Sequence, residues 1–209
     1  MFPLALLNAA SPPVDPTNLV LLMHFNTDFS DSTGRHIPTT YGSPTISNSI
    51  YAEGGGSLSL PSGTNFVRCN GATVSDDFIF LGNFSIKCKA RFNTLSTYQC
   101  VFFANTANDS EGFDNSYKVF MLVASTSGIV EVRSLSGGVV LSGGSVVINA
   151  WYDFELKREG STVSLVVNDV TVDTMTNSSQ WGKGQIYIGG NLSTIHMNGY
   201  IDSFEVYNV

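Results

Sequence analysis

Two consecutive stretches near the end of the chain decide the fold. They are Gln185-Ile186-Tyr187-Ile188-Gly189-Gly190 and, after a short excursion, Met197-Asn198-Gly199-Tyr200-Ile201-Asp202-Ser203-Phe204-Glu205-Val206-Tyr207-Asn208. Both are rich in β-branched and aromatic residues and are bounded by glycine, which is typical of strands. They predict two adjacent strands of a closed β-sandwich. Ile201, Phe204 and Val206 break strict alternation, so we expect a β-bulge at Asp202-Ser203, where the Asp202 carboxylate would bond backbone rather than do chemistry.

A third stretch, residues 84–92, has the clearest alternation of apolar and polar residues. One face carries Phe84, Ile86, Cys88, Ala90 and Phe92, and the other carries Ser85, Lys87, Lys89 and Arg91. A period of two with one apolar face is typical of a half-buried antiparallel strand.

The remaining apolar runs extend this pattern over the chain. We expect a first strand in 19–25, a strand after the glycines 54–56, further strands in 98–104 and 117–123, a hairpin of 129–134 with 139–141, and a meander of 152–158, 162–167 and 170–173. Turns at Glu159-Gly160 and Asn168-Asp169 join the meander, because Gly and Asn readily take positive φ. No segment predicts a helix of normal length.

Composition limits the class of protein. The 209 residues are 43% hydrophobic and only 13% charged, which fits one globular core and a protein that packs against others. The formal net charge of −7 opposes binding to nucleic acid. No run reaches the roughly 18 apolar residues of a membrane span, so we expect no membrane insertion. Cys69, Cys88 and Cys100 are expected to be free thiols in a reducing compartment.

Residues 1–16 are expected to form an extended anchoring arm before a single domain of residues 17–209. The first ten residues have no Lys or Arg before their apolar run, which argues against a signal peptide. Pro12, Pro13 and Pro16 keep the chain extended. The apolar side chains expected to anchor the arm are Phe2, Leu4, Leu6 and Leu7.

The C-terminal pair of stretches, together with Trp151 and the Val-x-Leu-x-Val-Asn run of 163–168, resembles laminin G-like domains. The resemblance implies an all-β, antiparallel two-sheet jelly-roll sandwich of the concanavalin A-like class, with the arm added in front. The opening from Leu21 to His36 resembles such domains in tailed-bacteriophage virion proteins, where the jelly roll sits on capsids, head fibres or tails and is usually non-catalytic. No shaft of repeats or heptads is present, so a long fibre is not expected.

Glycoside hydrolysis is the reaction that the resemblance to this fold class suggests. Retaining hydrolysis needs two carboxyl groups about 5–5.5 Å apart, and the Glu-x-Asp-x-x-Glu run of β-glucanases of this fold is missing. Asp153 and Glu155 share one phase of a strand, but a solvated strand face explains them better. The three histidines lack zinc-site spacing. We therefore expect no enzyme activity.

Two loops suggest ligands other than substrates of an enzyme. Calcium takes several oxygens from flexible loops, and the candidates are Asp109, Glu111 and Asp114 in the long loop, with Asp28, Asp31 and Ser32 after the first strand as a second set. Solvated loop acids are the favoured alternative, so no cofactor is expected. For sugar binding the candidates are Phe113, Asn115 and Trp181, since a flat ring stacks on a pyranose. The alternative for Trp181 is a hydrophobic plug at the end of the sandwich.

These observations favour a non-catalytic virion structural protein on the surface of a bacteriophage particle, assembled in the host cytoplasm. Residues 1–16 would anchor it to capsid or tail proteins, and the jelly roll would decorate the shell or adhere to host-surface glycans. We expect a homo-oligomer, because closed symmetric assemblies are common in shells and tails. A free carbohydrate-binding lectin is the alternative, and a glycoside hydrolase is the least favoured.

Overall fold

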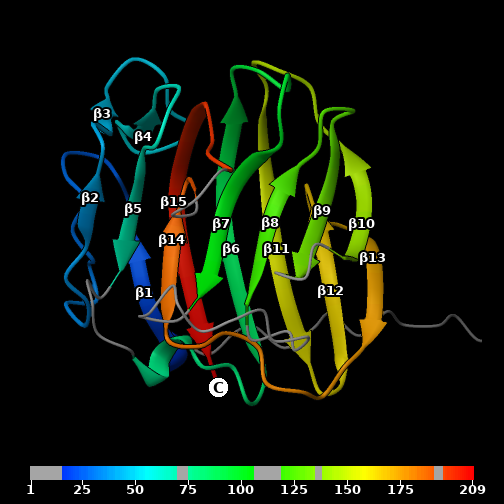
Figure 1. Cartoon of the computed structure of the whole chain (residues 1–209). Helices are drawn as coiled ribbons and strands as arrows, with labels where there is room; N and C mark the ends of the chain where they lie inside the picture. Colours follow the sequence, from blue (N-terminus) through cyan, green and yellow to red (C-terminus); the bar gives the residue numbers. More distant parts are fainter. Residues whose placement is uncertain (1–15, 70–74, 106–118, 135–137, 191–194) are drawn as a thin grey trace, which may run out of the picture.

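The computed structural model describes residues 16–69, 75–105, 119–134, 138–190 and 195–209, and nearly all regular structure in them is β-strand (Figure 1). The helical elements of this described part are two short 3₁₀ turns, η1 (Pro16–Asn18) and η2 (Asp76–Phe78). This agrees with the prediction that no segment forms a helix of normal length. None of its helices is long and apolar enough to cross a membrane.

Sheet A forms one layer of a sandwich. Its order is β13 (Val170–Thr176), β12 (Thr162–Val167), β11 (Trp151–Glu159), β6 (Phe84–Phe92), β15 (Gly199–Asn208), β4 (Ser57–Leu60) and β3 (Thr45–Ser47). β1 (Leu19–Met23) also pairs with β15. It lies along the same edge of β15 as β4 does. The predicted meander of three strands is therefore one flank of this sheet.

Sheet B forms the second layer. Its order is β10 (Val139–Ser145), β9 (Ile129–Ser134), β8 (Phe120–Ala124), β7 (Gln99–Asn105), β14 (Gln185–Ile188), β5 (Phe66–Cys69) and β2 (Thr39–Tyr41). The strand pairs described in both sheets are antiparallel, and the predicted hairpin of β9 and β10 is confirmed. The architecture agrees with the expected jelly-roll sandwich.

The two C-terminal stretches are strands, but they do not lie side by side. β14 pairs with β5 and β7 in sheet B, whereas β15 pairs with β6, β4 and β1 in sheet A. The prediction of adjacency was wrong because the chain crosses from one layer to the other between them (Figure 1). Alternation identifies a strand, but it does not identify the neighbour with which the strand pairs.

The main core fills the space between the sheets. Phe204 of sheet A and Phe102 of sheet B meet edge to face at 5.8 Å between ring centroids, and Phe120 and Trp181 extend the aromatic contact. All four side chains are fully buried. Edge-to-face aromatic pairs add stabilisation beyond the area they bury, so this cluster fixes how the layers pack.

A second buried cluster lies on the outer face of sheet B. Its members are Phe66, Cys100, Phe103, Val119, Met121, Val123 and Tyr187. They alternate along their strands with residues of the main core, such as Phe102, Leu122 and Ile186, and successive side chains of a strand point to opposite faces. Both faces of the middle of sheet B are therefore buried.

Candidate functional site

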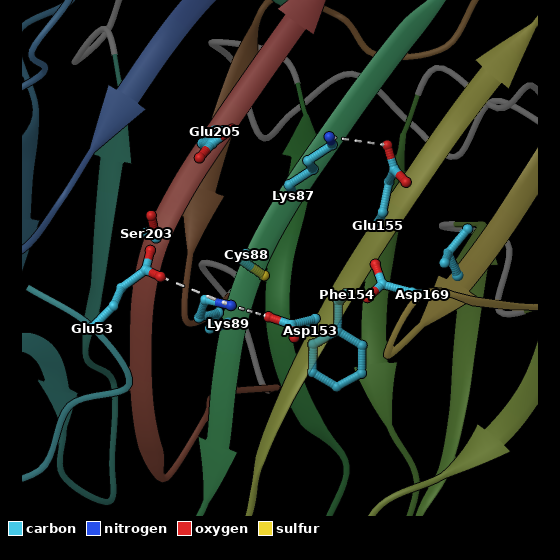
Figure 2. A pocket seen from close by; sticks show the side chains of 11 residues that line it. Glu53, Lys87, Cys88, Lys89, Asp153, Phe154, Glu155, Asp169, Ser203 and Glu205 are labelled. Carbon is cyan, nitrogen blue, oxygen red and sulfur yellow. Dashed lines mark hydrogen bonds and ion pairs between the residues drawn. The ribbon is translucent and has the colours of Figure 1, made fainter. Parts of the chain in front are cut away.

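A polar hollow opens on the outer face of sheet A (Figure 2). Its volume is about 350 Å³. The lining comes from β6, β11, β12 and β15 and from two turns: Glu53, Lys87, Cys88, Lys89, Asp153, Phe154, Glu155, Val166, Asp169, Ser203 and Glu205. Five carboxylates and two ammonium groups thus line one concave surface.

Strand register brings the charged side chains together. Lys87 at the middle of β6 lies directly opposite Glu155 on β11 and Glu205 on β15. Lys89, two residues further, lies opposite Asp153 and Asp202 in the same way. Directly opposed residues have Cβ atoms about 4.5–5.5 Å apart. The hollow is therefore built on one row that runs acid, lysine, acid across three strands, Glu155-Lys87-Glu205, with Lys89 and Asp153 beside it.

The carboxylates on the β11 side of the hollow are held by specific contacts. The Lys87 Nζ lies 3.6 Å from Glu155 Oε1, and the Ser85 hydroxyl donates to the same oxygen at 2.6 Å. Lys89 Nζ pairs with the Asp153 carboxylate and lies 3.9 Å from Glu53 Oε2. The hydrogen bond to Asp153 is the main reason that the pKa of Lys89 is raised.

Two tyrosines stand at the ends of this face. Tyr207 donates its hydroxyl to Glu205 at 2.9 Å, and burial, with the nearby Glu205 carboxylate, raises the pKa of Tyr207 to about 12. Lys87 Nζ lies 5.7 Å from the centroid of the Tyr207 ring, and Arg91 lies 5.5 Å from that of Tyr200. Such distances are within the range of cation–π contacts. Lys87 and Arg91, two cations on the outer face of sheet A, thus each contact one of the two tyrosine rings.

The predicted bulge in β15 puts both tyrosines on one face. Ile201, Phe204 and Val206 all belong to the core, so Tyr200 and Tyr207 both face outward, although a spacing of seven positions would put them on opposite faces of a regular strand. The register with β6 shifts between Asp202 and Glu205, and Ser203 takes a left-handed φ of 53°. One extra residue in a strand produces this change of face.

Asp202, next to the hollow on β15, has the structural role that the sequence predicts, because it binds backbone N–H groups. Its Oδ2 accepts the backbone N–H groups of Ala52 and Glu53 at 2.8 and 3.0 Å, while its buried Oδ1 has no hydrogen-bond partner among the described residues. Burial raises the pKa of Asp202. The carboxylate holds the 52–53 turn against β15 and has no exposed surface for a ligand.

The structure places Trp181 in the main core. The side chain is fully buried, its ring lies 5.0 Å from Phe120 and 6.0 Å from Phe84, and its indole N–H donates to Asn177. No face of the ring is open to a sugar, so the hydrophobic-plug alternative describes it. Trp181 is therefore not part of the candidate site.

The other predicted ligand-binding residues lie outside the described residues. These are the sugar candidates Phe113 and Asn115, the calcium candidates Asp109, Glu111 and Asp114, and the anchoring residues Phe2, Leu4, Leu6 and Leu7. The described residues themselves contain no cluster of three or more His, Cys, Asp or Glu side chains that could hold a metal ion.

The second set of calcium candidates, which follows β1, lies within the described residues. In this set, Asp31 organises a turn. Its two carboxylate oxygens accept the backbone N–H groups of Leu22, Thr33, Arg35 and His36 and the Thr33 hydroxyl. These five hydrogen bonds occupy the oxygens that a calcium ion would need. Asp28 is exposed and binds Ser30.

The hollow was not predicted as a site from the sequence. Asp153 and Glu155 were interpreted as a solvated strand face, and Lys87 and Glu205 belong to strands whose pairing the sequence does not give. A signal was present in the alternating Lys87, Lys89 and Arg91, since three cations on one strand face of an acidic chain imply acidic neighbours.

The fold is a two-sheet antiparallel β-sandwich with a polar hollow on the outer face of sheet A. Residues 61–209, more than half of the chain, match the concanavalin A-like lectin/glucanases superfamily, and the chain belongs to this superfamily. No curated protein matches the sequence.

Three solved structures illustrate the fold similarity. Domain 4 of an extracellular GH43 arabinanase from Geobacillus stearothermophilus, solved in complex with arabinotriose, is 18% identical, with a TM-score of 0.68 over 91% of this chain and 92% of that one. Trypanosoma rangeli sialidase is 13% identical (TM-score 0.66), with 100% of this chain and 33% of that chain covered. The receptor-binding domain of botulinum neurotoxin D is 12% identical (TM-score 0.62), with 91% and 49% covered. This chain thus spans about a third of the sialidase and half of the toxin domain.

Proposed function

We propose that this chain is a non-catalytic carbohydrate-binding domain, carried on the surface of a bacteriophage virion, that adheres to glycans through the hollow on sheet A. The observation that carries the proposal is the set of alternating carboxylates and lysines on β6, β11 and β15. Such a surface offers closely spaced donors and acceptors to sugar hydroxyls, and Tyr200 and Tyr207 of β15 present aromatic rings on the same face of sheet A.

Family membership and one fold relative support a carbohydrate ligand. The chain belongs to a superfamily of lectins and glucanases, and the arabinanase domain that it resembles over nearly its whole length was solved with arabinotriose. A free lectin, not attached to a particle, would use the same hollow in the same way.

The charges in the hollow support binding without catalysis. A glycosidase needs a carboxylic acid that stays protonated, which an apolar pocket provides. Here Lys87 lies opposite both Glu155 and Glu205, and the hollow is lined mainly by charged side chains, so it is not an apolar pocket. Asp202 has a raised pKa, but it is fully buried. Release of reducing sugar by the purified chain would contradict this part of the proposal.

Glycan binding is tested with the full chain on a panel of neutral oligosaccharides that includes arabinotriose, with affinities from titration calorimetry. Glu155→Gln removes one charged acceptor, and we expect a loss of affinity of about tenfold, because hydrogen bonds to a charged group contribute roughly 1.5–3 kcal/mol. Glu159→Gln is the matched control, since Glu159 lies on the same strand but pairs with Lys157 outside the hollow. No binding to any panel member, or equal losses in both variants, would contradict the proposal.

The resemblance of residues 21–36 to phage virion domains and the low charged fraction of 13% support the location on a particle. Deletion of residues 1–16 should abolish binding to particles and leave the thermal unfolding of the domain unchanged. Quantitative mass spectrometry of purified particles gives the copy number: hundreds of copies indicate shell decoration, and a handful indicate a tail adhesin. Absence from particles would overturn the location and favour the free lectin.

A further inference from the structure

Arg68 differs from the other arginines of the chain. Arg35 pairs with Asp77, Arg133 with Glu131, Arg91 with Asn93 and Asn149, and Arg158 with backbone carbonyls. Arg68 makes no hydrogen bond or ion pair with any described residue, and its Nε is buried without a partner. In a chain with 17 acidic and 10 basic residues, an unpaired guanidinium is unexpected.

Aromatic rings fix the position of this side chain. The Arg68 guanidinium carbon lies 4.9 Å from the centroid of Tyr41 and 6.0 Å from that of Tyr187. Tyr41 in turn stacks on Phe66 at 4.6 Å with an interplanar angle of 15°. Cation–π contacts of this kind orient a guanidinium without neutralising its charge. Arg68 is therefore held in place and remains available to an anion.

Strand register places Arg68 at an accessible border of sheet B. β2 is the edge strand, and its exposed Thr39 lies directly opposite the half-buried Arg68 on the same face. On its other side Arg68 lies opposite Tyr187, a residue of the buried outer cluster. The guanidinium thus stands between an apolar surface and an exposed hydroxyl-bearing edge.

A buried donor left without a partner is costly in free energy, and a bound ion or water is one of the partners that such a group takes in a folded protein. We propose that Arg68, with the Thr39 hydroxyl beside it, forms an oxyanion site at the β2–β5 edge of sheet B that binds the carboxylate or sulfate of an acidic sugar. The identification of the ligand as a sugar rests on the proposed function. The planar guanidinium suits both anions, because it can donate two parallel N–H bonds.

This site is independent of the hollow described above. Arg68 belongs to sheet B, whereas the hollow is lined by strands of sheet A and by the turns at Glu53 and Asp169. A glycan with both neutral and acidic units could therefore contact either layer. The two sites are separable by substitution.

The test uses the full chain and three probes: sodium glucuronate, glucose 6-sulfate and neutral glucose, each titrated by NMR at low ionic strength. We expect at least one acidic probe to bind in a salt-dependent manner, with glucose unbound at this site. Arg68→Gln should weaken acidic binding at least tenfold, and Arg68→Lys should weaken it less, because it keeps the charge and loses the planar fork. Arg133→Gln is the matched control and should bind like the wild type, because Arg133 also lies on the outer face of sheet B and over a tyrosine ring, but it pairs with Glu131.

Loss of acidic binding in Arg68→Gln, with retention in Arg133→Gln, supports the site, and the probe that binds identifies carboxylate or sulfate as the preferred anion. No binding of either acidic probe, or equal binding by Arg68→Gln, overturns it. If neutral oligosaccharides still bind and depend on Glu155, the proposed function stands while this inference fails. Should Arg68→Gln fail to fold, Thr39→Val and Arg68→Lys carry the test, and unchanged acidic binding in both overturns the site.

Discussion

At the scale of single residues, Asp31 makes the densest set of contacts in the segment after β1. Burial acts to raise the pKa of this carboxyl, but the hydrogen bonds from Thr33, Leu22 and His36 outweigh it and lower the pKa. Next to it, Arg35 and His36 contact the Asp77 carboxylate, at 2.6 and 3.2 Å, on η2. One carboxylate thus fixes the turn that joins β1 to a distant part of the chain.

Asp31→Asn is expected to lower the free energy of unfolding by about 2 kcal/mol at pH 7, because it removes the charge that several N–H groups face. Because the folded pKa is lowered, the contribution of Asp31 is fully present above the unfolded value of about 4 and disappears as pH falls through the folded value. Urea unfolding at pH 7 and pH 3 should therefore show a smaller difference between variant and wild type at pH 3. Asp28→Asn, at an exposed acid, is the control, and an equal loss there would contradict the argument.

The three cysteines give a second prediction at this scale. Cys69, Cys88 and Cys100 are free and buried, and desolvation raises the pKa of each thiol. Because the thiolate is the reactive form, Ellman's reagent at pH 8 should label none of them in the folded chain and all three in guanidinium chloride. Rapid labelling of the native protein would show that a described strand opens.

At the scale of elements, the bulge in β15 decides which residues line the hollow. A valine at Ser203 cannot readily take the φ of 53° seen here, so Ser203→Val should destabilise the fold by about 1–2 kcal/mol. Ser203→Gly should stay within about 1 kcal/mol of the wild type, since glycine accepts positive φ. Chemical unfolding measures the free energy of unfolding of both variants. Equal stability of Ser203→Val and Ser203→Gly would mean that a side chain at residue 203 does not strain the bulge.

Strand identity followed from the sequence because alternation is a local property. The half-buried strand 84–92, the hairpin, the meander with its Gly160 turn (φ 60°) and the bulge at Asp202 are all confirmed. The short strands β2, β3 and β5 were missed, since three or four residues carry too little pattern.

The candidate site depends on pairing and was not predictable in the same way. Lys87 meets Glu155 and Glu205 only because β6 lies between β11 and β15, whose sequence separations are large. Trp181 was ambiguous for a related reason: the indole carries a polar N–H, but its burial is decided by Phe120 and Phe84 from other strands. Long-range contacts, rather than local pattern, assign these residues.

At the scale of the whole molecule, the link between the layers depends on a buried cation. Arg158 of β11 is 1% exposed and donates from Nε to Gly82 O at 2.6 Å and from its terminal nitrogens to Ser179 O at 2.6 Å and Phe80 O at 3.0 Å. Burial lowers its pKa. Ser179 lies in the connection from β13 of sheet A to β14 of sheet B. Arg158 therefore holds the crossover between the layers against sheet A.

Arg158→Met should lower the free energy of unfolding by about 2 kcal/mol, because it keeps the aliphatic volume but removes the side-chain donor to the Gly82 and Ser179 carbonyls, while the Phe80 carbonyl keeps the Trp181 backbone N–H. Arg91→Met is the control, since Arg91 donates to side chains at the surface, and it should lose less than about 1 kcal/mol. Guanidinium chloride unfolding followed by tryptophan fluorescence reports on the crossover directly, because Trp181 lies in that connection. A loss in Arg158→Met no larger than in the control would mean that aromatic packing alone holds the two sheets together.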